Sequence, residues 1–180
     1  MDQQASIPVT MNFTKATLAA GSTTTISTTG TTTFAIRGKF YTKTAITNGA
    51  TPTTDYATGA AFLPIPIPAT APNLAPGYGS IYSVGFDSGG NIRVIQGTVV
   101  PLDASGNFIN APQFGSLGSQ GSGNAASTNN DFCMIGYIVV KLGATAVATW
   151  TFGTNNLSSV TGVTYAFVDV ATEPDRPQVS

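Results

Sequence analysis

The chain has 180 residues, of which only 8% are charged, and its eight acidic residues and seven Lys and Arg give a formal net charge of -1. It contains no His, the commonest general acid/base and a frequent metal ligand, which excludes Ser–His–Asp triads and His-based metal sites. Seven cations scattered along the chain predict no basic patch, so we expect no nucleic-acid partner. A net charge this close to zero gives little repulsion between copies and favours self-association.

The N-terminus and the single cysteine indicate where the protein folds. The first residues, MDQQASIPVTMNF, lack the cationic and apolar segments of a signal peptide, and no apolar run is long enough for a membrane span. Cys133 is the only cysteine, and its apolar neighbours predict a small buried side chain rather than a reactive thiol. We therefore expect folding in a reducing cytoplasm, with no membrane partner.

Strand signals dominate the chain and helix signals are scarce. Its 20 Gly and 11 Pro interrupt nearly every window that could form a helix, whereas Thr, Val, Ile, Phe and Tyr recur in short runs. Residues 1–14 are predicted to be an extended N-terminal arm that ends in a strand near Ile7–Phe13. The Thr-rich stretch Ser22–Thr33 is predicted to form a strand, a turn at Gly30 and the start of another strand. Its Thr residues follow no strict period, so they indicate exposed strand faces rather than an ice-binding surface.

The next segment, Thr32–Ile46, alternates so regularly that it predicts one strand with two different faces. One face is largely apolar and is expected to be buried, whereas the other is basic and is expected to face solvent. The first series is Phe34, Ile36, Gly38, Phe40 and Thr42, and the second is Ala35, Arg37, Lys39, Tyr41 and Lys43.

Prolines concentrate in residues 48–78. Within Leu63–Pro68 they alternate with Ile, and a proline has no N–H to contribute to a sheet. We therefore expect a Pro-rich, polyproline-like overlay loop that lies over the domain or over a neighbouring molecule.

Two turns share the pattern Asp-x-x-Gly-Asn, at Asp87–Asn91 and Asp103–Asn107. In such a turn the carboxylate accepts hydrogen bonds from nearby N–H groups and the Gly adopts a positive φ. Neither turn has enough oxygen ligands for calcium, so both are predicted to be structural. The first is expected to join Ile81–Phe86 to Ile92–Val100, and the second to join Val99–Leu102 to Phe108–Ile109.

The last third of the chain returns to strands. The segments predicted to be strands are Phe132–Leu142, which is expected to be central, Ala148–Phe152 and Val163–Val170. About eight short strands separated by turns predict an all-β fold, with a β-sandwich or jelly-roll-like domain over residues 15–170. Residues 115–130 are predicted to be a Gly/Ser-rich loop, and residues 171–180 an extended C-terminal tail.

No residue is predicted to be catalytic, cofactor-binding or metal-binding. The one local group of carboxylates is Asp169, Glu173 and Asp175, and sugar hydrolysis needs a pair of carboxylates. This group lies at the start of the polar tail, where a solvated surface is expected, so a sugar-cleaving enzyme is the least favoured interpretation. The six tyrosines are dispersed, which indicates strand and rim positions rather than a sugar-stacking tip.

Three segments carry a family resemblance. Gly38–Phe62, Val94–Phe114 and Phe132–Ser180 resemble a family of small virion proteins of tailed bacteriophages. The resemblance covers most of the chain and rests on its overall pattern rather than on a catalytic motif. It implies a non-enzymatic, β-rich structural protein of the virion, assembled in the host cytoplasm.

Within that family, the expected function is that of a capsid decoration, or cement, protein that binds the outside of the head and stabilises it. The resemblance implies two partners, the major capsid protein and further copies of the chain, with a trimer as the expected homo-oligomer. The arm, the overlay loop and the tail would lie along neighbours or add strands to them. The alternative is a head-fibre or tail-fibre module that binds a host surface glycan.

Overall fold

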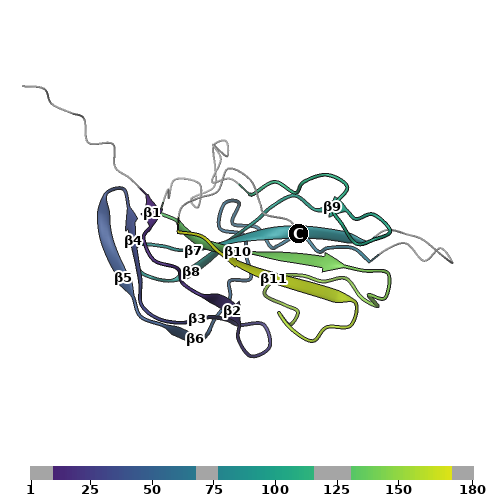
Figure 1. Cartoon of the computed structure of the whole chain (residues 1–180), viewed down its shortest axis with the longest axis horizontal. Coiled ribbons are helices and arrows are strands. Elements are labelled where there is room, and N and C mark those ends of the chain that lie inside the picture. The colour runs from purple at the N-terminus through teal and green to yellow at the C-terminus, as the bar shows by residue number, and fades with distance from the viewer. Residues whose placement is uncertain (1–9, 68–76, 116–130, 172–180) are drawn as a thin grey trace, which may run out of the picture.

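The computed structural model describes residues 10–67, 77–115 and 131–171, and every helix or strand within them is a β-strand (Figure 1). The predicted all-β class is therefore confirmed. The strands are β1 (Met11–Asn12), β2 (Leu18–Ala20), β3 (Ile26–Thr28), β4 (Thr32–Ile36), β5 (Lys39–Lys43), β6 (Ile46–Gly49), β7 (Tyr78–Phe86), β8 (Ile92–Gln96), β9 (Val100–Pro101), β10 (Cys133–Leu142) and β11 (Val163–Asp169). They form three antiparallel sheets. None of the described residues forms a helix long and apolar enough to span a membrane.

The largest sheet has the strand order β11-β10-β7-β8, and β9 also pairs with β7. Strands β7 and β10 pair along nearly their whole length, from Phe86 opposite Cys133 to Tyr78 opposite Leu142. All residues of β10 except Lys141 are buried, because both faces of this strand are covered. The almost wholly apolar sequence of the segment follows from that position, and its predicted central place is confirmed.

The two smaller sheets, β1-β4-β5 and β2-β3-β6, continue one another. Met11 pairs with Ala35, and Leu18, seven residues later, pairs with Thr28, seven residues before Ala35. The two sheets are therefore one antiparallel arrangement of three chain segments, which we call the meander layer. The sequence predicted a turn at Gly30, but Gly30, with a φ of 77°, forms only a bend between β3 and β4, and the chain continues in the same direction.

The meander layer packs against one face of the five-stranded sheet, and it wraps around one end of that sheet (Figure 1). The core between the layers contains Leu18, Ile26, Phe34 and Ile36 from the meander layer, Tyr82, Val84, Phe86, Ile135, Ile138 and Val140 from the large sheet, and Phe62, Ile65, Trp150 and Phe152 from connecting segments. A second cluster covers the other face of the large sheet; its buried members are Ala57, Ile81, Ile95, Phe132, Met134, Tyr137 and Val139. This arrangement is the predicted β-sandwich-like fold.

The single strand predicted over Thr32–Ile46 is wrong, because the chain reverses in the middle of it. β4 ends at Ile36, and Arg37 and Gly38 form a two-residue turn with φ angles of 51° and 77° before β5 begins. Positive φ at both central residues is the signature of a type I′ hairpin turn. The segment is therefore a hairpin, and its chain continues into β6, which the sequence did not predict.

The turn exchanges the two predicted faces of β5. Cross-strand partners lie on the same face of a sheet, so Tyr41 lies beside Phe34 on the core side and Phe40 lies beside Ala35 on the outer side. Tyr41, predicted to face solvent, stacks on Phe34 with 5.5 Å between ring centroids. Phe40, predicted to be buried, is 68% exposed, and Ala35 is buried rather than solvent-facing.

Both Asp-x-x-Gly-Asn turns have the predicted geometry. The Asp87 carboxylate accepts the Asn91 N–H at 2.9 Å, and the Asp103 carboxylate accepts the Asn107 N–H at 2.8 Å. Gly90 has the expected positive φ of 72°. The first turn joins β7 to β8. The second follows β9 and is flanked by Leu102 and Phe108, which form an isolated antiparallel bridge across it.

The described part of the Pro-rich segment lies over the protein's own core. Ile65 is fully buried and forms an isolated antiparallel bridge with Trp150, with backbone hydrogen bonds of 2.8 and 3.1 Å. The strand predicted over Ala148–Phe152 is reduced to this bridge, because Pro64 and Pro66 flank Ile65 and lack the N–H groups that would extend it. Residues 68–76 of the predicted overlay loop lie outside the described residues.

The two chain ends of the described body lie together. The Asn12 side chain donates a 2.9 Å hydrogen bond to the Val170 carbonyl. The strand expected near Ile7–Phe13 corresponds to β1, which pairs with β4 and is therefore part of the sandwich. Residues 1–9 of the predicted arm, 116–130 of the predicted loop and 172–180 of the predicted tail lie outside the described residues.

Candidate functional site

A polar cleft lies where the β4–β5 hairpin meets the turn between β7 and β8. It has a volume of about 380 Å³ and is lined by Ile36, Arg37, Lys39, Tyr41, Ser88 and Asp131. The Asp131 carboxylate accepts hydrogen bonds from the Ser88 N–H at 2.8 Å and from the Ser88 hydroxyl at 2.6 Å. These bonds connect the segment just before β10 to the turn between β7 and β8. The cleft therefore has one fixed carboxylate on one side and two cations on the other.

Cations gather at this corner of the molecule. Lys43, the last residue of β5, lies so close to the β7–β8 turn that a Cβ on Gly90 would be 3.1 Å from its Cδ. The ion pair formed by the described residues is Arg93 with Asp87, at 2.8 Å. Arg37, Lys39 and Lys43 therefore have no described carboxylate within ion-pair distance, and the corner carries an excess of positive charge.

The Asp87 turn supports the corner electrostatically. Burial acts to raise the pKa of the Asp87 carboxyl, but hydrogen bonds from Asn91 and Arg93 outweigh it, and the pKa lies below its usual value. The Arg93 guanidinium also lies 5.1 Å from the centre of the Tyr56 ring, a cation–π distance. Burial, followed by the nearby Asp131 carboxylate, raises the pKa of the Tyr56 hydroxyl. Arg93 is thus committed to structural contacts, unlike the three cations of the hairpin.

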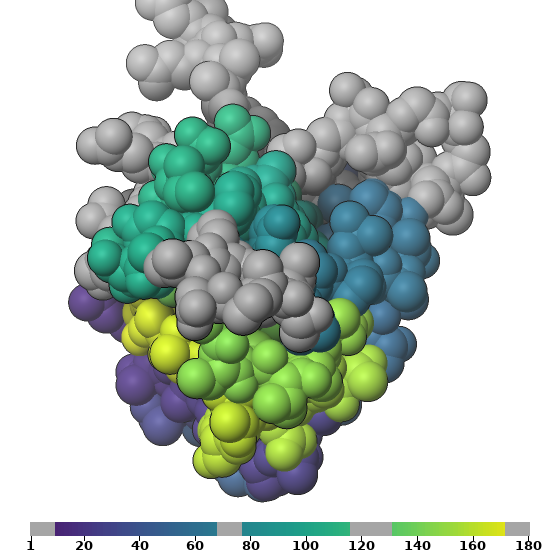
Figure 2. Space-filling model, turned by 90° about the vertical axis from the view of Figure 1, so that its right-hand side faces the viewer, coloured from purple at the N-terminus to yellow at the C-terminus, as the bar shows by residue number. Residues whose placement is uncertain are grey.

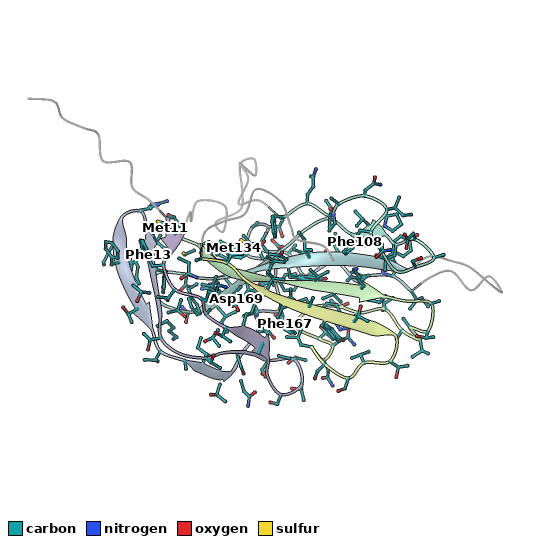
Figure 3. All side chains as sticks on the ribbon, in the orientation of Figure 1. Met11, Phe13, Phe108, Met134, Phe167 and Asp169 are labelled. Carbon is teal, nitrogen blue, oxygen red and sulfur yellow. The ribbon has the colours of Figure 1, made fainter. Side chains whose placement is uncertain are left out.

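The outer face of the same hairpin exposes a stacked aromatic pair. Phe13 follows β1 and Phe40 lies on β5, with ring centroids 5.3 Å apart and an interplanar angle of 22°. The side chains are 42% and 68% exposed. Figure 3 shows Phe13 and Met11 at the β5 end of the molecule, far from Phe108 at the other end. Two large apolar rings held against each other in solvent are a typical feature of a contact surface.

The three neighbouring acidic residues of the sequence, Asp169, Glu173 and Asp175, do not form a site within the described residues. Asp169 accepts the Leu18 N–H at 2.7 Å and so connects β11 to the meander layer, while Glu173 and Asp175 lie outside the described residues. Cys133 is buried at the start of β10, as predicted. No group of three or more Cys, Asp or Glu residues in the described ranges is placed to hold a metal ion.

Comparisons of the chain with protein-family models, with curated proteins and with solved structures found no match.

The sequence alone predicted neither the cationic corner beside the cleft nor the exposed Phe13–Phe40 pair. The sequence shows the cations as dispersed, but Lys43 lies beside Gly90 because the hairpin packs against the β7–β8 turn. The alternation of the sequence places Phe40 in the core because it gives no account of the turn at Arg37–Gly38. The signal that could have found the turn is Gly38 itself, in the centre of an otherwise continuous alternation.

Proposed function

We propose that this protein is a non-enzymatic structural protein of a phage virion that decorates the outside of the capsid and stabilises it as a homo-oligomer. The observation that carries the proposal is the gathering of contact features on one side of the molecule. The exposed Phe13–Phe40 pair lies on the meander layer, and the Asn12–Val170 hydrogen bond brings both ends of the described body to that layer. A clamp needs its aromatic contacts and its terminal segments on one side.

The rest of the molecule is suited to support such a surface. The large sheet has covered residues on both of its faces, so the body does not need the exposed pair for its core. Figure 2 shows the opposite end of the molecule, formed largely by the β9 region and by the chain around residues 140–165. Val147, which is exposed and follows the end of β10 at Leu142, is a suitable position for a control substitution.

The test adds purified protein to particles that lack it. Wild-type protein is expected to bind in hundreds of copies per particle and to reduce DNA release on heating or chelation, because a ligand of the assembled shell stabilises it by mass action. Phe13→Ser with Phe40→Ser is expected to weaken binding by about ten-fold or more, the scale of a lost aromatic anchor. Val147→Ser, which removes an 80% exposed side chain, is the control and should bind as wild type. Equal particle survival with and without the protein would contradict the proposal.

A second candidate is a head-fibre or tail-fibre module that binds a host glycan. The observation that favours it is the cleft, where Arg37, Ser88 and Asp131 offer donors and an acceptor for sugar hydroxyl and carboxyl groups. A few copies per virion at the tail, together with binding to host polysaccharide, would support this function and reject decoration.

A further inference from the structure

The outer edge of β5 has the features of a strand-addition site. β5 pairs with β4 on one side, and no other described strand pairs with it. Figure 1 shows it at one extremity of the molecule, with no described strand beyond it. An edge strand presents unpaired N–H and C=O groups that can accept an extended chain.

The hydrogen bonds of β4 show which groups of β5 face outward. The Thr33 carbonyl accepts the Phe13 N–H at 2.9 Å, and the Thr33 N–H donates to the Thr14 hydroxyl at 2.8 Å, so both backbone groups of Thr33 point away from β5. Thr33 lies opposite Thr42, and this must be a non-hydrogen-bonded pair of the antiparallel ladder. The backbone groups of Thr42, and by alternation those of Phe40, therefore point to the open edge.

The side chains along this edge are sorted by chemistry. Lys39, Tyr41 and Lys43 alternate on the side of the cleft, and Phe40 lies on the outer side with Phe13. Arg37, Lys39 and Lys43 have no described carboxylate within ion-pair distance. Three uncompensated cations in a chain with seven in total make this edge the most positive feature of the described surface.

The charges select the occupant of the edge. If two copies paired through β5 about Tyr41, Lys39 of each copy would lie opposite Lys43 of the other, and like charges directly opposite destabilise a strand pair. An extended segment with carboxylates at those positions would pair favourably. The Tyr41 ring already contacts Phe34 and lies 5.3 Å from the Lys39 ammonium, so it is not free to stack on a sugar.

We propose that β5 binds an extended acidic peptide segment of a partner protein as an added strand. The segment has carboxylates four residues apart, opposite Lys39 and Lys43, and apolar residues between them on the side of Phe40. Backbone hydrogen bonds to Phe40 and Thr42 hold the added strand. The ion pairs and the apolar contact determine which peptide sequences bind. The proposal does not depend on the capsid location, because the site is described by peptide chemistry alone.

The test uses a labelled, end-capped peptide with the sequence Ser-Glu-Val-Thr-Val-Glu-Ser and, as a control, the same peptide with Lys in place of Glu. Fluorescence anisotropy at low salt should show binding of the Glu peptide and at least a ten-fold weaker signal for the Lys peptide. Lys39→Glu with Lys43→Glu should weaken the Glu peptide by about ten-fold, because two attractions become repulsions. Lys141→Glu, at the far end of β10, should leave binding unchanged.

A second pair of variants separates strand addition from simple charge attraction. Thr42→Pro removes an outward N–H that β4 does not use, so the hairpin should persist while peptide binding falls about five-fold, the scale of one backbone hydrogen bond. Thr42→Ala keeps the N–H and should bind as wild type. Circular dichroism melting checks that each variant is folded.

Three results would overturn the proposal. One is no binding of the Glu peptide at low salt. Another is equal binding by Thr42→Pro and Thr42→Ala, which would reduce the site to side-chain charge. The third is displacement of the peptide by polygalacturonate with a higher affinity that Thr42→Pro does not change, which would identify an acidic sugar as the ligand. Capsid binding measured with the same variants is a separate readout, so failure of the peptide site and failure of the decoration function remain distinguishable.

Discussion

The two layers of the sandwich use similar residues for different purposes. In the large sheet, β10 is buried on both faces, and its aromatic and aliphatic side chains are enclosed by loops as well as by the other layer. In the meander layer, β5 has one half-covered face, one open edge and an exposed Phe40. From this comparison we expect an apolar residue in a strand to stabilise the fold mainly where a second layer covers it. Elsewhere it is available for contacts, and substitutions in the two layers should therefore differ in kind.

The largest effect is expected from Trp150→Ala. Trp150 is fully buried, packs edge-on against Tyr82 and Phe152, and donates its indole N–H to the Asn156 carbonyl at 3.0 Å. Removing the ring leaves a cavity next to the large sheet and one fewer hydrogen bond to the Asn156 carbonyl, which still accepts the Tyr165 hydroxyl at 3.0 Å. The free energy of unfolding should fall by about 3–5 kcal/mol. Denaturant unfolding measures this change. A loss below about 1 kcal/mol, the central value for ordinary substitutions, would show that the core relaxes around the missing ring.

Asp87→Ala should have the next largest effect, about 2 kcal/mol, because it leaves the part-buried N–H donors of Asn91 and Arg93 without their charged acceptor. The effect should depend on pH. The pKa of Asp87 in the folded protein is lowered from its ordinary 3.8, so its stabilising contribution is present above that pH and is lost as the pH falls through the folded value.

Unfolding free energies of wild type and Asp87→Ala, measured from pH 7 down to the acid limit of folding, check this prediction. The difference between the two proteins should be constant near neutral pH and shrink below about pH 3.8. The exposed Asp103 also has a lowered pKa, through hydrogen bonds from Asn107 and Ser105, but it is present in both proteins and its contribution cancels. A difference that grows as the pH falls would contradict the assigned direction.

Arg37→Asn is expected to stabilise the meander layer slightly. Arg37 adopts a φ of 51°, where Asn is more readily accommodated than Arg, and Asn-Gly is a preferred pair for a type I′ turn. The gain should be about 0.5 kcal/mol, the scale of other turn optimisations. Arg37→Ala removes the same cation without favouring positive φ and should show no gain. Equal stability changes in the two variants would mean that charge, rather than backbone conformation, determines the effect.

Phe40→Ser should have the smallest effect on stability, within about 0.5 kcal/mol, because the ring is largely in solvent. This variant tests the comparison of the layers directly, since Phe34 on the neighbouring strand is buried in the core and Phe34→Ser should be strongly destabilising. Thermal melting of the two variants side by side is sufficient. Similar losses at both positions would show that Phe40 supports the fold.

The sequence predicted the parts of the fold whose signals are local. The central place of Phe132–Leu142 followed from its unbroken apolar character, and both Asp-x-x-Gly-Asn turns followed from the chemistry of Asp and Gly. The hairpin at Arg37–Gly38 was missed because Arg is an unusual residue for a positive φ, and because the residues on both sides of the turn alternate. One missed turn was enough to exchange the faces of β5.

The candidate site was less accessible to sequence reasoning because it is tertiary. Lys43 and Gly90 are far apart in the chain and meet only when the hairpin packs on the large sheet. The open edge of β5 is likewise a property of strand order, which no local pattern encodes.

The continuous pairing of the meander layer has a consequence for the order of folding. Each of its strands pairs with the next segment of the chain, so residues 11–49 can form their hydrogen bonds before the large sheet has been synthesised. Until β7 and β10 arrive, however, Leu18, Ile26 and Phe34 have no opposing layer, and an early meander would expose them to solvent. We therefore expect residues 11–49 to be prone to aggregation during translation until the later sheet docks and covers them.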